Sequence, residues 1–246
     1  KSGLVINAPT LGWKNVNILA PLRKEFDEVD VYLENSGKAC ALSQIWATRT
    51  DNADLSDIVF VSVSDGVGVG VVINGELIRG RHNTAGEFGH VPLSIDGPPC
   101  SCGASGCWEA YISNLSTLSR YFGKDQRQRQ PRTLEEQNFT IEDLIMRARG
   151  GDSKALTTLH TTARYLGLGL ASIINAVDPN YIYIGGEITE AWDLINHEVS
   201  SAIKERTLTK DLGTTPIRIV PAIEHPRLRG AVALVTAPAF AAPKVA

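Results

Sequence analysis

The chain has 246 residues, of which 43% are hydrophobic and 21% charged, an ordinary composition for a globular protein with a sizeable core. A net charge of -3 argues against a strongly basic nucleic-acid surface within these residues. No apolar signal segment opens the sequence, and the longest apolar stretch, residues 231–242, is too short to span a bilayer. We therefore expect a cytoplasmic protein with no membrane partner.

Apolar runs with a period of two predict strands, and runs with helical spacing predict helices between them. The expected strands cover residues 3–7, 29–33, 57–64, 69–73, 76–79, 181–184 and 217–220. The expected helices cover residues 39–48, 107–121, 140–149, 152–178, 188–208 and 229–240. Asn74-Gly75 between two strands predicts a hairpin, and the polar residues 124–138 predict a solvated surface loop. The alternation of strands and helices indicates an α/β fold.

A loop rich in glycine and proline contains four residues with metal-binding side chains, His90, Cys100, Cys102 and Cys107. In a reducing compartment, a tight cysteine cluster indicates a metal before a disulfide. Three thiolates and one imidazole fill a tetrahedral zinc shell and leave no position for water, so the zinc would be structural. The alternatives are free cysteines beside an unrelated histidine, or a strained disulfide within the cluster. Cys40 falls in a helical pattern and is predicted to be a core residue.

Three polar residues could form a sugar pocket beside this metal. Glu87 precedes the histidine by three residues and Glu109 follows the last cysteine by two, so the loop would hold both carboxylates near a fixed point. Fixed carboxylates are good acceptors for adjacent sugar hydroxyls. Asn35 follows the expected strand 29–33, at the kind of strand end where α/β ligand sites gather. Taken singly, Glu109 could equally be a helix N-terminal charge, Glu87 a solvated loop acid and Asn35 a turn residue.

The most distinctive segment reads AGEFGHVPLSIDGPPCSCGASGCWEA and spans residues 85–110. It resembles the signature of the ROK family, which comprises bacterial repressors, open reading frames and sugar kinases. Further blocks resemble the family's blocks in the expected order, namely LVINAPTLGW, VDVYLENS, SDGVGVGVVINGELIRG and LGLASIINAVDPNYIYIGGEIT. The resemblance covers nearly the whole chain. It implies an actin-like, ribonuclease H-like fold of two lobes with a zinc-stabilised loop, and sugar bound between the lobes.

The resemblance also assigns residues to sites. It places the zinc ligands at His90, Cys100, Cys102 and Cys107. It places the sugar contacts at Asn35, Glu87, His90 and Glu109. It places a vestigial nucleotide side at Gly66, Gly68, Gly185 and Gly186. Residues 1–52 would be the remainder of an N-terminal lobe, residues 53–235 the C-terminal lobe with the zinc loop, and residues 236–246 a terminal helix or tail. Dimers or tetramers are common in the family.

Three departures from the family's kinases argue against phosphoryl transfer. Ser36 stands where the kinases carry the aspartate that accepts the proton of the sugar hydroxyl, and losing a general base costs about 10²–10⁴ in rate. Asp65 lies in a turn where the kinases have Gly-Thr-Gly, and its charge would face nucleotide phosphates. The family's first phosphate loop, an Asp-x-Gly-Gly-Thr turn, has no counterpart after an opening strand. The string DLGTT at residues 211–215 mimics it but is interpreted as an ordinary connection.

The resemblance and its departures predict the effector portion of a sugar-responsive transcriptional regulator. Sugar would close the cleft between the lobes and move the DNA-binding arms of a dimer. A winged helix-turn-helix precedes the first lobe in the family's repressors, so DNA would be bound by a segment absent from this chain. The alternatives are an ATP-dependent sugar kinase with another base and a zinc-stabilised scaffold with an empty cleft. Glucose, xylose, N-acetylated hexosamines and their phosphates all remain candidate ligands.

Overall fold

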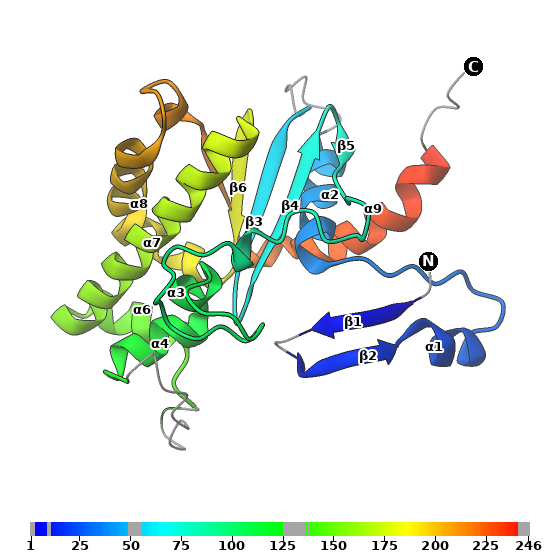
Figure 1. Cartoon of the computed structure of the whole chain (residues 1–246), viewed down its shortest axis with the longest axis horizontal. Helices are drawn as coiled ribbons and strands as arrows, with labels where there is room; N and C mark the ends of the chain where they lie inside the picture. The colour runs from blue at the N-terminus through cyan, green and yellow to red at the C-terminus, as the bar shows by residue number, and fades with distance from the viewer. Residues whose placement is uncertain (1–2, 9–10, 49–55, 125–135, 137, 241–246) are drawn as a thin grey trace.

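The computed structural model describes residues 3–8, 11–48, 56–124, 136 and 138–240, and its centre is a mixed sheet of five strands (Figure 1). The strands lie in the order β5-β4-β3-β6-β7. Their bounds are Ile58–Val63 for β3, Val67–Ile73 for β4, Glu76–Leu77 for β5, Tyr181–Gly185 for β6 and Ile217–Val220 for β7. Strands β3, β4 and β5 pair antiparallel, whereas β6 runs parallel to both β3 and β7. The expected α/β architecture is confirmed.

The central strand β3 separates two hydrophobic cores, because successive side chains of a strand point to opposite faces. Val59 and Val61 belong to the larger core. Ile58 and Phe60 belong to a smaller core with Cys40 of helix α2 (Ser36–Thr48). All six residues of β3 are buried, which explains why the strand is apolar at nearly every position. Cys40 is 1% exposed, so its predicted place in the core is confirmed.

Helices cover both faces of this sheet (Figure 1). Helices α2 and α9 (Pro226–Phe240) pack against each other on one face. On the other face α7 (Ser153–Val177) packs against α8 (Trp192–Arg206). The expected boundary between residues 235 and 236 falls inside α9.

The remaining elements are short. An antiparallel pair, β1 (Leu4–Ala8) and β2 (Trp13–Asn17), precedes α1 (Leu19–Glu25) and lies apart from the five-stranded sheet (Figure 1). Between the β4–β5 hairpin and α7, the chain forms α3 (Glu109–Ile112), α4 (Asn114–Tyr121) and α6 (Ile141–Arg149). Three 3-10 helices have three residues each, namely η2 (Phe88–His90), η4 (Leu212–Thr214) and η5 (Ala222–Glu224). A longer 3-10 helix, η3, covers Glu187–Ala191. Across the described ranges, no helix has both the length and the apolar character to cross a membrane.

Local sequence signals place several element ends correctly. Asn74 and Gly75 adopt left-handed φ angles of 53° and 73°, as a type I′ turn requires, and the predicted hairpin is confirmed. Thr140 forms a capping box with Asp143 at the start of α6, and the carboxylate of Asp152 accepts hydrogen bonds from the first turn of α7. The DLGTT string connects α8 to β7 through η4, as expected of an ordinary connection.

Other expected elements differ in the structure. Residues 29–33 form no ladder with any described strand, and the side chains of Val29 and Leu33 are exposed. Their alternation allows an extended chain but does not supply the partner strand that a ladder needs. The expected helix 107–121 is divided at Ser113, whose ψ of 156° ends α3 and whose side chain caps α4. The expected helix 188–208 begins at Trp192, after η3. The expected surface loop at residues 124–138 lies almost entirely outside the described residues.

Candidate metal centre and its surroundings

The four predicted metal ligands meet at one point. One ligand atom from each of His90, Cys100, Cys102 and Cys107 lies within 4.8 Å of the others. Nδ1 of His90 is 3.6 Å from Sγ of Cys100, and the sulfurs of Cys102 and Cys107 are 3.7 Å apart. A tetrahedral ion with metal–sulfur bonds of about 2.3 Å sets its sulfurs about 3.8 Å apart, so this donor set fits a zinc ion. The three cysteines of the cluster are free in the structure, in keeping with metal ligands and not with a disulfide.

Tight backbone turns bring the ligands together. Pro92 bridges to Cys107, and Pro99 bridges to Ser105, so the loop doubles back on itself. Gly106 has a φ of 73°, and a Cβ there would collide with the carbonyl of Ser94. Only glycine allows this close approach, which explains the glycine directly before the last cysteine.

Trp108 anchors the metal loop to the larger core. Its ring is 1% exposed and lies against Gly169 in α7, where a Cβ would be 2.0 Å from the ring carbon Cε2. Its Nε1 donates a hydrogen bond to the carbonyl of Tyr165 at 2.8 Å. The sequence interpretation did not identify Trp108 as a functional residue, although a tryptophan between a ligand cysteine and an acid is a usable signal. The residue fixes the last ligand, Cys107, relative to α7.

Burial makes two of the three thiols of the cluster reluctant to ionise. It raises the pKa of Cys107 to about 12, and it also raises the pKa of Cys100. Burial acts in the same direction on Cys102, but hydrogen bonds from the Ala104 backbone and from the neighbouring thiols outweigh it and lower the pKa of that thiol. Binding of a metal would therefore have to displace protons from buried sulfurs.

The acids of the loop have different surroundings. Glu87 is exposed directly before η2. Glu109 is 9% exposed, and its Oε2 accepts a hydrogen bond from the backbone nitrogen of Val67 at 2.9 Å. Its Oε1 accepts one from Ser101 Oγ at 3.0 Å and lies 3.6 Å from Sγ of Cys100. The Glu109 carboxylate thus connects the metal loop to β4, and Ser101 is a contact that the sequence interpretation missed.

In His90 and in Asn35, one polar atom of the side chain already has a partner within the chain. His90 turns Nδ1 toward the sulfurs, which leaves Nε2 for a second partner. Asn35 Oδ1 accepts hydrogen bonds from the backbone of Gly37 at 2.8 Å and Lys38 at 3.4 Å, so it caps α2. Its Nδ2 group is then the donor that a ligand could use.

The glycines assigned to a nucleotide side separate into two environments. Gly68 faces Gly37 of α2, where a Cβ would be 3.3 Å from the backbone nitrogen, so it serves helix packing. The carbonyl of Gly66 accepts a hydrogen bond from Ser64 and closes the turn that contains Asp65. Gly186 follows Gly185 at the end of β6 with a φ of 104°. Gly186 lies at the carboxyl ends of the parallel strands, where α/β proteins collect ligands.

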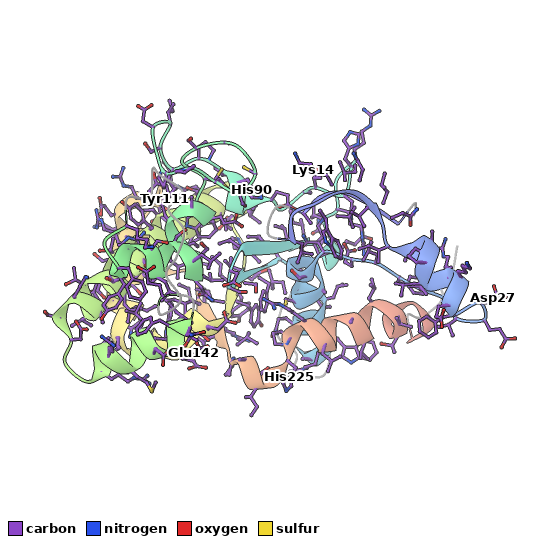
Figure 2. The ribbon with its side chains drawn as sticks, turned by 90° about the horizontal axis from the view of Figure 1, so that it is seen from below. Lys14, Asp27, His90, Tyr111, Glu142 and His225 are labelled. Carbon is purple, nitrogen blue, oxygen red and sulfur yellow. The ribbon has the colours of Figure 1, made fainter. Side chains whose placement is uncertain are left out.

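A cavity of about 250 Å³ opens beside these strand ends. It is lined by Ser62, Gly186, Glu187, Ala222, His225, Pro226, Arg227 and Leu228. Glu187 accepts a hydrogen bond from Asn114 Nδ2 at 3.0 Å, and the Asn114 backbone donates to Ser64 at 2.8 Å. Asn114 therefore connects Glu187 to the turn that carries Asp65, and the sequence interpretation missed Glu187. Figure 2 shows His225 and His90 on opposite sides of the molecule, so the cavity and the metal ligands are separate.

Comparison with known protein sequences places the chain among sugar-related repressors and kinases. The sequence pattern described as "ROK family" matches residues 1–237. The xylose repressor of Bacillus subtilis (strain 168) is 29% identical over 210 residues, 85% of this chain and 51% of that protein. The transcriptional dual regulator NagC of Escherichia coli (strain K12) is 29% identical over 234 residues, 95% of this chain and 56% of that protein. The chain thus spans about half the length of the curated relatives it matches.

Solved structures show the same fold. A ROK family glucokinase from Streptomyces griseus, in complex with glucose and AMPPNP, superposes with a TM-score of 0.79 at 23% identity. The alignment covers 95% of this chain and 77% of that one. A ROK family transcriptional regulator, homologous to the E. coli MLC protein, superposes with a TM-score of 0.75 at 26% identity and covers 96% of this chain and 59% of that one.

Proposed function

Because the chain belongs to the ROK family, we propose that it is the sugar-binding, effector-sensing portion of a transcriptional regulator that contains one structural zinc ion. In this proposal His90, Cys100, Cys102 and Cys107 hold the zinc, and the closed donor set gives it a structural role. The ion would fix the loop and the start of α3 and would take no part in a reaction. Xylose repressors and NagC among the relatives support a regulator that responds to a sugar.

The sugar contacts would come from four side chains around the metal loop. His90 can donate from Nε2 while Nδ1 binds the ion, and Asn35 can donate from Nδ2 while Oδ1 caps α2. Glu87 is exposed and free to accept from adjacent sugar hydroxyls. Glu109 would have to share oxygens that already accept from Ser101 and Val67, so its contact with sugar would be the most constrained.

One observation supports a sensor over a kinase: Glu187 lines the cavity beside Gly186, where a nucleotide would need neutral or positive groups. Asn114 connects Glu187 to the backbone of Ser64, which directly precedes Asp65 in the turn. Phosphoryl transfer requires donors that neutralise developing negative charge. Ser36, at the position of the kinases' base, cannot accept a proton unaided at neutral pH.

The proposed regulator would transmit the sugar signal by a shift in the population of its conformations. Of the residues 1–52 expected in one lobe, α2 packs on the large sheet, so only the part before α2 would belong to that lobe and the rest to the other. DNA would be bound by a segment outside this chain, and a homodimer or homotetramer would bring two such segments to one operator. The charge of the chain supports this division, because a net charge of -3 argues against a strongly basic surface within it.

Calorimetric titration of the zinc-loaded chain with neutral, N-acetylated and phosphorylated sugars, each with and without an ATP analogue, tests this function. We expect binding of a sugar without nucleotide. Glu87→Gln should weaken that binding by about tenfold and leave the zinc in place, because a charged acceptor is replaced by a neutral one. Glu25→Gln, at an exposed acid of α1, is the matched control. Loss of zinc in Glu87→Gln would refute the separate roles of the acid and the metal ligands.

A sugar kinase is the second candidate function, and one observation favours it. The cavity at the strand ends includes Gly186 and Arg227, and Arg227 could meet an anionic ligand. The glucokinase of Halalkalibacterium halodurans is 28% identical over 200 residues, 79% of this chain and 59% of that protein. Mutually reinforcing binding of sugar and ATP analogue, followed by sugar-dependent ADP release from the full-length protein, would establish the kinase in place of the sensor.

A further inference from the structure

Lys38 is a buried cation in the first turn of α2, three residues after Asn35. The residue is 1% exposed, although burial penalises an ammonium group and the start of a helix already carries positive partial charge. Burial lowers the pKa of Lys38, whereas Glu34 and Glu87 oppose that change by favouring the charged form. A cation in this position needs compensating partners, and these are Glu34 and the loop of residues 79–87, which contains Asn83 and Glu87.

The first link between α2 and this loop is made by Lys38 itself. Its Nζ donates to the backbone carbonyl of Asn83 at 2.6 Å and lies 3.4 Å from Asn83 Oδ1. Asn83 has a left-handed φ of 61°, and Ala85 N donates to Arg79 O at 3.0 Å, so the loop is folded back on itself. Lys38 therefore holds the middle of the loop against the first turn of the helix.

The second link runs through Glu34. Its side chain is 5% exposed, and Oε2 forms a 3.0 Å ion pair with Nε of Arg79 at the start of the loop. The other oxygen, Oε1, accepts a hydrogen bond from the backbone nitrogen of Asn35 at 3.0 Å. Glu34 thus ties the start of the loop to the backbone of a proposed sugar contact.

The segment that contains Asn35 and the segment that contains Glu87 both pack against Val69 of β4. A Cβ at Gly37 would lie 2.6 Å from the nitrogen of Val69, and a Cβ at Gly86 would lie 2.9 Å from its carbonyl oxygen. Asn35 lies two residues before Gly37, and Glu87 directly follows Gly86. The two segments are therefore adjacent on the strand, and Lys38 and Glu34 bridge them.

We propose, on the basis of the sugar site proposed above, that Lys38 is a positioning residue that holds Asn35 and Glu87 at the spacing a sugar requires. The ammonium acts through the loop and need not touch the ligand, because it donates to Asn83 and is almost fully buried.

Lys38→Met tests this role, because methionine keeps an unbranched apolar stem and removes the charge. We expect faster hydrogen exchange of the backbone amides in residues 79–87, with the exchange of β3 and α7 unchanged. Affinity for the best sugar of the calorimetric panel should fall about tenfold. The melting temperature should change little, because the desolvation cost of the ammonium is removed together with its hydrogen bonds to Asn83. Lys210→Met, at an exposed lysine, is the control.

The double variant Lys38→Met with Glu87→Gln separates positioning from general stability. If Lys38 acts through the placement of Glu87, the two losses of affinity will be less than additive. Fully additive losses, or unchanged exchange in residues 79–87 of Lys38→Met, would overturn the inference. A wild-type chain that binds no sugar would overturn the proposed function, and the exchange data alone would then decide whether Lys38 orders the loop.

Discussion

Replacement of Trp108 should show how strongly the metal loop is held to the core. The ring is 1% exposed, and loss of a buried aromatic ring to alanine costs about 3–5 kcal/mol. The hydrogen bond from Nε1 to Tyr165 adds about 1 kcal/mol. Trp108→Ala should therefore remove about 4 kcal/mol or more from a total that is typically about 5–15 kcal/mol. Trp108→Phe keeps most of the ring and should cost much less.

Gly169 provides an internal check on this reasoning. In the wild type a Cβ at residue 169 would lie 2.0 Å from Trp108, so Gly169→Ala should destabilise by about 1–3 kcal/mol. In the Trp108→Ala background that collision is absent, and alanine should stabilise α7 by up to about 1 kcal/mol through its helix propensity. Urea unfolding of the zinc-loaded proteins, followed by far-ultraviolet circular dichroism, measures the free energy of unfolding of the wild type, the two single variants and the double variant. An equal cost of Gly169→Ala in both backgrounds would refute the contact as its cause.

Two other predictions concern the metal and the start of α7. Cys102→Ser should lower bound zinc, measured by metal analysis, and speed hydrogen exchange in residues 90–107; Cys40→Ser, at a core cysteine outside the cluster, should keep its zinc. Hydrogen bonds, chiefly from the Ala155 backbone, hold the pKa of Asp152 below its usual range. That stabilisation is present above the unfolded pKa of about 3.9 and is lost as pH falls through the folded value. The free energy of unfolding of Asp152→Asn should therefore fall less steeply with decreasing pH than that of the wild type. An unchanged pH dependence would count against this role of Asp152.

The sequence supports prediction best where a local pattern decides the structure. The run IVFVSV, the Asn74-Gly75 turn and the caps Thr140 and Asp152 each depend on neighbouring residues and are all observed. The metal ligands were also predictable, because turns within one loop bring them together. Residues 29–33 failed because a strand is defined by a partner, which alternation cannot reveal.

Contacts between distant segments could not be predicted. Lys38 meets Asn83 across 45 positions, and Asn114 meets Glu187 across 73, so neither pair leaves a local pattern. Gly68 illustrates the same limit in a different way. The family resemblance assigned it to a nucleotide side, and the structure adds that it faces Gly37 and lets α2 approach β4. A glycine shows that space is short, but only the fold shows which segment occupies it.

Glu109 gives the metal loop a physical connection to the opposite, acidic side of the site. Its carboxylate contacts Ser101 and Cys100 in the loop and accepts from the backbone of Val67, the first residue of β4. Val67 directly follows the turn of Asp65 and Gly66, which Asn114 joins to Glu187. Any ligand that drew the Glu109 carboxylate away from Val67 would release a buried backbone donor at this turn, and leaving that donor unpaired costs about 1–3 kcal/mol. A sugar contact at Glu109 would therefore be coupled to the conformation of the turn, and the proposed sensor requires a coupling of this kind.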